Sequence, residues 1–111
     1  MMIHYLESTA DIDGQFRYSL VRVWDASRPR LLWVMCNPST ADAETLDPTL
    51  RKCQGYSQRW GYGGFEVANL YAFRSPHPKV LKSHGYPVGA RNDEAIIAAL
   101  SRCGRVVAAW G

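Results

Sequence analysis

The sequence has no long apolar run. No stretch approaches the roughly 18 residues that a membrane-spanning helix needs, although 47% of its 111 residues are hydrophobic. The first fourteen residues carry acidic side chains and no basic cluster ahead of an apolar stretch, unlike a secretory signal. We therefore expect a cytoplasmic protein without a membrane partner.

Cysteine is scarce and is not grouped. Cys36, Cys53 and Cys103 are an odd number, lie far apart and form no CxxC pair. This pattern fits reduced thiols and argues against a disulfide framework and against a zinc site. The three histidines have no metal-ligand spacing, and the common phosphate-loop, serine-hydrolase and zinc-protease motifs are absent. The sequence thus predicts no metal and no cofactor.

Charge is unevenly distributed along the chain. Residues 1–50 carry four basic and seven acidic side chains, whereas residues 51–111 carry nine basic and three acidic ones, for a net charge of +3. The second part is therefore basic, which favours an anionic partner such as a nucleic acid or a nucleotide.

Apolar periodicity and turn residues predict one α/β domain over residues 1–111, with residues 1–14 as a lead-in or an edge strand. A three-layer arrangement is expected, with a mostly parallel central sheet of about four strands whose N-terminal strand is antiparallel. The predicted strands are 16–24, 31–35, 65–71 and 105–111, and the predicted helices are 47–60 and 92–103, with one helical turn at 79–83.

For one pair of strands and for the two longer helices, the sequence also predicts the orientation of individual residues. Strand 31–35 is expected to pair with strand 16–24, in which Arg17, Ser19 and Arg22 mostly face solvent. In helix 47–60, Asp47 is the expected N-cap and the apolar stripe ends at Trp60. In helix 92–103, residues 92–94 form the expected cap, and the buried face is formed by Ile96, Ala99, Leu100 and Cys103.

The candidate site lies where two buried strands end. Leu31–Met35 runs directly into Cys36-Asn37-Pro38-Ser39-Thr40, and the strand at 65–71 leads into a polar segment that contains Arg74. Ligands in open α/β sheets bind beyond the carboxyl ends of the strands. Asn37 could read a base edge or simply form the turn, and Ser39 and Thr40 could bind phosphate or cap the loop.

Other polar residues near these strand ends complete the candidate set. Asn69 interrupts an apolar strand, so a ligand or the turn at Asn37 must satisfy its amide. Asp47 and Arg51 are spaced i, i+4, as in a local salt bridge or a pair that lines a cleft. Arg74 is either a phosphate clamp or a surface arginine, and Tyr71 could stack on a base or belong to the core.

Six motifs resemble a known family. They are CNPSTAD at 36–42, DPTLRKC at 47–53, RWGYGG at 59–64, ANLYAFRS at 68–75, PVGARND at 87–93 and VVAAWG at 106–111. In order and spacing they resemble the bacterial and phage domain-of-unknown-function family 1643, from Arg17 onward. That family usually continues past the AWG element, so the resemblance implies that this chain covers roughly its first two thirds.

The family in turn resembles the uracil-DNA glycosylase superfamily. MCNPS at 35–39, ANLYAFRSP at 68–76 and VVAAWG resemble three of its motifs, with Met35 in place of a glycine. This resemblance implies a glycosylase-like fold and hydrolysis of an N-glycosidic bond, with Asn37 positioning the water. It implies that Ser39 and Arg74 hold phosphate. The histidine-bearing motif that stabilises the departing base in those enzymes lies in the segment expected to be missing.

Two readings compete with a glycosylase-like enzyme. One is a non-catalytic interaction module that forms a homodimer through an exposed sheet edge, with apolar surface left uncovered around Val107 and Trp110. The other is an incomplete fragment of a larger enzyme.

Overall fold

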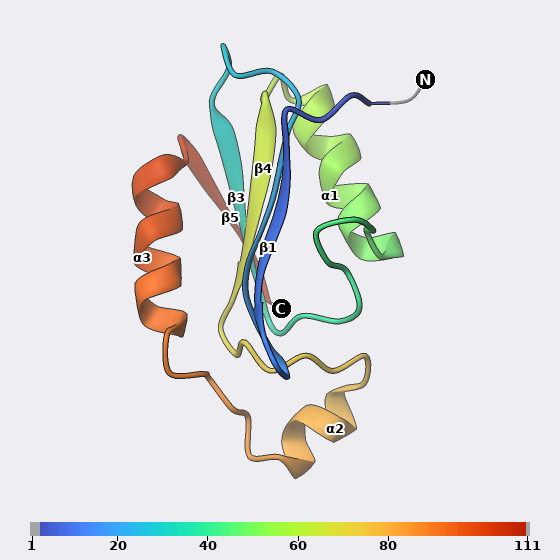
Figure 1. Ribbon diagram of the computed structural model, residues 1–111, viewed down its shortest axis with the longest axis vertical. Helices are drawn as coiled ribbons and strands as arrows, with labels where there is room; N and C mark the ends of the chain where they lie inside the picture. Colours follow the sequence, from blue (N-terminus) through green and yellow to red (C-terminus); the bar gives the residue numbers. More distant parts are fainter. Residues whose placement is uncertain (1–2, 111) are drawn as a thin grey trace.

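The computed structural model describes residues 3–110 and shows an α/β domain with a five-stranded mixed sheet and three helices (Figure 1). The elements in chain order are β1 (Glu7–Asp13), β2 (Phe16–Val23), β3 (Arg30–Met35), α1 (Pro48–Arg59), β4 (Gly64–Asn69), α2 (Pro78–Ser83), α3 (Asn92–Arg102) and β5 (Arg105–Ala109). Each predicted strand and helix is present. The N-terminal residues form an edge strand, one of the two predicted alternatives. Gly111 of the last predicted strand lies outside the described residues.

The strand order is β1-β2-β4-β3-β5. Strand β4 pairs antiparallel with β2 and parallel with β3, and β3 pairs parallel with β5. The predicted pairing of β2 with β3 is therefore wrong, because β4 lies between them. The prediction of a mostly parallel sheet of about four strands is also corrected, because the described sheet has five strands with two parallel and two antiparallel pairings. Strand β4 is central, so it has a hydrogen-bonded neighbour on each side and is covered on both faces. All six of its residues are therefore buried.

One helix covers each face of the sheet (Figure 1). On one face, Leu50 and Cys53 of α1 pack against a cluster that includes Leu20, Trp33 and Phe65. On the other, Ala99 of α3 packs against Leu32, Val34 and Ala68. The three layers follow from strands that are apolar on both faces and helices that each carry one apolar stripe.

A β-bulge in β2 changes which side chains are buried. Ser19 faces Asp11 and Arg17 faces Ile12, so that Tyr18 is the extra residue of the ladder. A bulge restarts the alternation of side chains along a strand. It places Arg17 on the α1 face together with Arg22, and both arginines are buried, with 2% and 1% of their surface exposed. The prediction that these arginines face solvent is therefore wrong.

Asp47 caps α1 as predicted, because its side chain accepts a hydrogen bond from the N–H of Leu50. Three other residues of the two longer helices and their caps differ from the prediction. Trp60 is 54% exposed and stacks on Trp33 instead of joining the core. Asn92 is the first residue of α3, not its cap, and Leu100 lies on the solvent side of that helix.

The helices of the described chain are short. No helix within residues 3–110 is long and apolar enough to cross a membrane.

Candidate functional site

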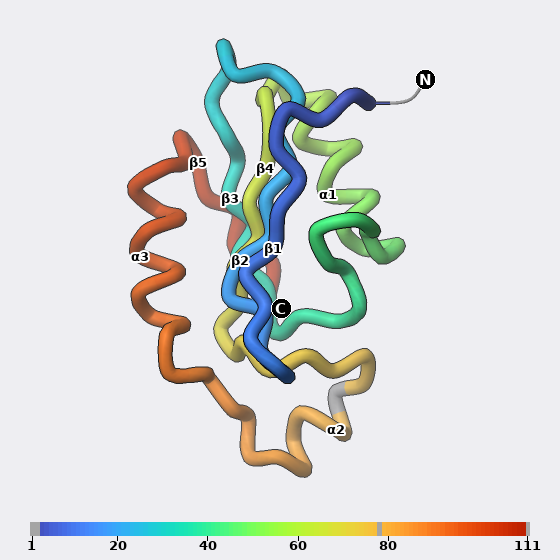
Figure 2. The backbone as a smooth tube through the Cα atoms, in the orientation of Figure 1, coloured from blue at the N-terminus to red at the C-terminus, as the bar shows by residue number. Residues whose placement is uncertain are grey.

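A cavity of about 210 Å³ lies at the carboxyl edge of the three parallel strands. Met35 is in register with both Asn69 and Ala109, so β3, β4 and β5 end at the same level. The segments that follow β3 and β4 leave the sheet at this end (Figure 2). The wall of the cavity is formed by Arg17, Met35, Cys36, Asn37, Pro38, Ser39, Asp47, Thr49, Leu50, Asn69 and Ala109.

The side chain of Asn69 is buried in this cavity without a partner. Only 1% of the residue is exposed, and neither the Nδ2 nor the Oδ1 atom has a hydrogen-bond partner within residues 3–110. Its backbone is held firmly: Asn92 Nδ2 donates to the Asn69 carbonyl at 2.7 Å. An unsatisfied buried polar group costs about 1–3 kcal/mol. The fold therefore buries an amide whose donor and acceptor both have no partner among the described residues.

Arg17 brings a buried cation to the same cavity. Its Nη1 donates to the Ala41 carbonyl at 3.2 Å, and its Nε has no acceptor among the described residues. Burial lowers the pKa of Arg17 to about 10, an effect that the negative charge of Asp47 opposes. Arg74 and Arg22 also lower this pKa through their positive charge. At neutral pH the guanidinium is thus protonated, enclosed and short of acceptors.

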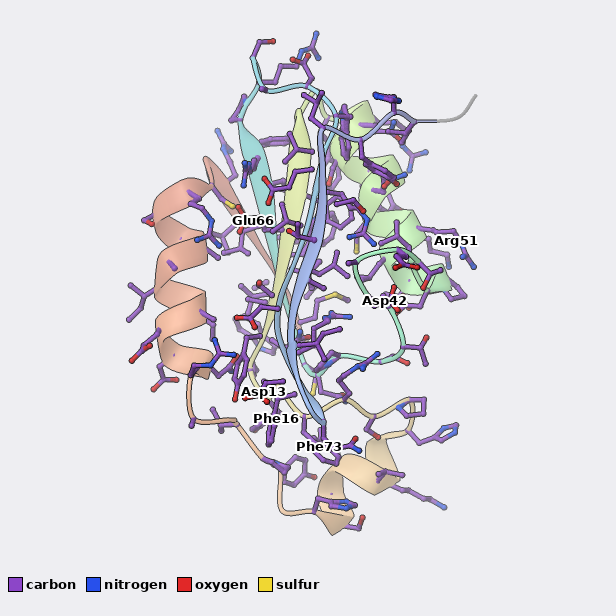
Figure 3. All side chains as sticks on the ribbon, in the orientation of Figure 1. Asp13, Phe16, Asp42, Arg51, Glu66 and Phe73 are labelled. Atoms are coloured by element: carbon purple, nitrogen blue, oxygen red, sulfur yellow. The ribbon has the colours of Figure 1, made fainter. Side chains whose placement is uncertain are left out.

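Three arginines hold the loop at 36–46 through its backbone carbonyls. Arg22 donates to Asp42 and Thr45, and Arg74 donates to Ser39 and Thr40 at 3.3 Å each, in addition to the bond from Arg17 to Ala41. Asp42, marked in Figure 3, accepts from the N–H groups of Glu44 and Thr45, which lowers its pKa. The loop beside the cavity is thus held by three arginines whose hydrogen bonds run to neutral carbonyl groups, and of these Arg17 lines the cavity.

Asn37 links the two segments that follow the strands. Its Nδ2 donates to the carbonyls of Pro38, Phe73 and Ser75 at 3.2, 3.4 and 3.0 Å. The N–H of Ser75 in turn donates to the Pro38 carbonyl at 2.8 Å. The amide nitrogen of Asn37 is therefore used by the turn, while the residue still lines the cavity.

The structure brings half of the predicted site residues together. Asn37, Ser39, Asp47 and Asn69 line the cavity, and Thr40, Arg51, Tyr71 and Arg74 do not.

The residues outside the cavity make other contacts. Arg51 points away from the sheet (Figure 3) and donates to the Leu46 carbonyl, and within the described chain it forms no ion pair with Asp47. The ring of Tyr71 lies 5.4 Å from that of Tyr86. Neither the salt bridge nor the cleft-lining pair expected of residues 47 and 51 is formed.

Arg17 is the main site residue that the sequence prediction missed. Arg17 and Arg22 are five residues apart, an odd spacing that a regular strand would place on opposite faces. Two arginines in an otherwise apolar strand were the available signal, but the bulge that brings them to one face cannot be read from alternation.

The cysteines divide by position. Cys36 lines the cavity, whereas Cys53 lies on the buried face of α1 and Cys103 is the C-cap residue of α3. Burial raises the pKa of Cys53 to about 11, and burial together with Glu66 raises that of Cys103 to about 12. These two thiols are therefore protonated at neutral pH and act as apolar packing groups. Within residues 3–110, no group of three or more His, Cys, Asp or Glu residues could hold a metal ion.

Fold and cavity together define an α/β domain with a small pocket, lined by both polar and apolar residues, at the carboxyl edge of a mixed sheet. A family described as "Protein of unknown function (DUF1643)" matches residues 17–111, and the chain belongs to this family. No curated protein and no solved structure matches the chain. The resemblance to the uracil-DNA glycosylases therefore rests on three short motifs.

Proposed function

We propose that this domain recognises a nucleobase, free or within a nucleotide, in the cavity at the carboxyl edge of β3, β4 and β5. The observation that carries this proposal is the buried side-chain amide of Asn69, which has no hydrogen-bond partner within residues 3–110. A carboxamide offers a donor and an acceptor side by side, and a base edge presents the complementary pair.

The remaining walls suit a flat heterocycle. Met35, Leu50 and Ala109 supply apolar surface, while Ser39 and Asp47 add polar groups at the turn and at the start of α1. Sites for drug-sized ligands usually measure about 300–1,000 Å³. The cavity of about 210 Å³ is smaller, which favours a small ligand such as a base or a mononucleotide over a larger molecule.

Binding of free bases and nucleosides tests this proposal. We expect isothermal titration calorimetry to detect a one-to-one complex with at least one common base or nucleoside. Labelled single- and double-stranded DNA should be titrated in parallel at two salt concentrations, because binding to phosphates weakens steeply with salt. Absence of binding to every base, nucleoside and DNA would contradict the proposal.

A second candidate function is hydrolysis of an N-glycosidic bond in the same cavity. It is favoured by Asn37, whose nitrogen donates to backbone carbonyls while the residue lines the cavity, and Asp47 lines the same cavity. With its nitrogen engaged in this way, the side-chain oxygen is the group that would orient an attacking water.

Replacing Asn37 by alanine is expected to abolish any release of base from a nucleoside or from damaged DNA, because the water would lose its orienting acceptor. Release is measured by chromatography and divided by the folded fraction from circular dichroism, since Asn37 also holds the turn. Lys52→Ala, an exposed change on α1, is the control and should leave release unchanged. Undiminished release by Asn37→Ala would remove Asn37 from the mechanism.

An interaction role for the β5 edge is a separate candidate. Val106 and Trp110 are 48% and 49% exposed, and β5 has one hydrogen-bonded neighbour in the described sheet. An edge strand with exposed apolar side chains is a template for pairing with a second copy. We expect sedimentation velocity to show a dimer that Val106→Lys converts to monomer, with Val80→Lys on α2 as the control. A monomeric wild-type protein would contradict this candidate.

A further inference from the structure

We propose that the ligand of this cavity carries a phosphate group and that the guanidinium of Arg17 binds it. This inference rests on the proposed role of the cavity as a nucleobase or nucleotide site, and narrows it to a nucleoside phosphate. Asn69 would read the base, and Arg17 would bind phosphate oxygens.

Within the described chain, the charge of Arg17 has no directly paired carboxylate. The side chain is 2% exposed, donates one hydrogen bond to a neutral carbonyl and leaves its Nε without an acceptor in the described chain. A buried charge is costly unless it is paired and hydrogen-bonded. No carboxylate lies within ion-pair distance of Arg17 among the described residues, and Asp47 acts on it only from further away.

Arg22 provides an internal comparison, because it is buried on the same face of the same strand. Its two terminal nitrogens donate to the carbonyls of Thr9, Val21, Asp42 and Thr45, so its donors are used by the protein itself. Arg17 holds the same loop through the single carbonyl of Ala41. The contact with Ala41 uses one of the guanidinium nitrogens of Arg17. The Nε donor, which has no acceptor in the described chain, points to a ligand.

The charged groups that act on Arg17 include two further arginines. Arg22 and Arg74 lie close enough to lower the pKa of Arg17 by repulsion, and both donate to backbone carbonyls of the loop. Asp47 is the one acidic residue in the wall of the cavity. A ligand with an anionic group removes this repulsion, whereas a neutral ligand leaves it in place. Guanidinium binds phosphate oxygens through paired, charge-assisted hydrogen bonds.

The first test uses inorganic phosphate and the intact protein. At equal ionic strength, saturating phosphate is expected to raise the melting temperature of the wild-type protein by at least about 4 °C relative to chloride. Arg17→Met should show no such shift. Arg22→Met is the matched control. We expect it to lower the melting temperature in both phosphate and chloride, but to leave the increase caused by phosphate unchanged.

If Arg17→Met does not fold, Arg17→Lys serves in its place. A lysine keeps the charge but loses the paired donors, so we expect the phosphate shift to fall to less than half. The proposal is overturned if phosphate and chloride give the wild-type protein the same melting temperature. It is equally overturned if the shift survives undiminished in the Arg17 variants.

A second arm separates this inference from the proposed function and a nucleotide from free phosphate. We expect the wild-type protein to bind a nucleoside 5′-monophosphate at least 10-fold more tightly than the corresponding nucleoside. In Arg17→Met, the nucleotide and the nucleoside should bind with the same affinity. Nucleoside binding without a gain from phosphate overturns the inference and leaves base recognition standing. Phosphate binding that depends on Arg17, without any nucleoside or nucleotide binding, supports the oxyanion site and overturns the proposed function.

Discussion

Replacing Asn69 by leucine is expected to stabilise the folded protein and to weaken recognition of the ligand. Leucine has the same branched heavy-atom shape as asparagine and removes a donor and an acceptor that have no partner in the described chain. Relief of these buried groups should raise the free energy of unfolding by about 1–3 kcal/mol. Loss of the amide should weaken base binding by roughly 5- to 150-fold, since a paired contact to a base contributes about 1–3 kcal/mol.

Urea denaturation and calorimetry measure the two effects on the same samples. Asn92→Ala is the matched control, because Asn92 is also a buried asparagine but donates to the carbonyls of Asn69 and Leu70. This control should destabilise the protein. A large loss of stability in Asn69→Leu would show that its amide is satisfied inside the protein, and the argument for a ligand would fail.

The second large effect is expected at Glu66, in the middle of β4 on the side of the sheet that faces α3 (Figure 3). Its fully buried carboxylate pairs with Arg30 at 2.8 Å and with Arg102 at 2.7 Å. Removing one partner of a buried ion pair costs about 3–5 kcal/mol. The side chains of Arg30 and Arg102 are 28% and 44% exposed and can return to water. We therefore expect Glu66→Gln to cost about 3 kcal/mol, the lower end of that range.

The pH dependence of Glu66→Gln provides the control. Burial favours the neutral form of Glu66, but hydrogen bonds from Arg102 and Arg30 outweigh it and lower the pKa below its ordinary 4.5. A lowered folded pKa gives stability that is complete above about pH 4.5 and is lost as the pH falls through the folded value. The difference between wild type and Glu66→Gln should shrink in that range. Exposed Glu44→Gln should show little difference at any pH, and a gap at Glu66 that is unchanged in acid would contradict the pairing.

The elements of the fold were predictable because their signals are local. Asp47 followed by proline marks the start of α1, and the apolar stretch at 31–35 marks β3, without any knowledge of the neighbouring strands. The order of the strands was not predictable in the same way. Strand β4 pairs with both β2 and β3 because it is the central strand. The sequence of a single strand does not show which strand is central, since burial on both faces arises only in the assembled sheet.

The candidate site shows the same division. Asn37 and Asn69 stand out in the sequence because an amide at the end of an apolar strand needs a partner, and both line the cavity. Arg51 and Tyr71 have equally suggestive positions along the chain, yet their side chains lie elsewhere. Spacing along one element places residues on a common face but does not say what that face contacts.

By itself the sequence determined the class of the domain, the helices and strands, and the edge of the sheet at which polar groups collect, since each depends on residues close together in the chain. Only the tertiary structure decided that Arg17 is buried in the cavity while Arg51 is outside it, and that Asn69 has no side-chain partner among the described residues. The physical reason is that a bulge and the packing of distant segments set the solvation of each polar group, and solvation determines which group needs a ligand.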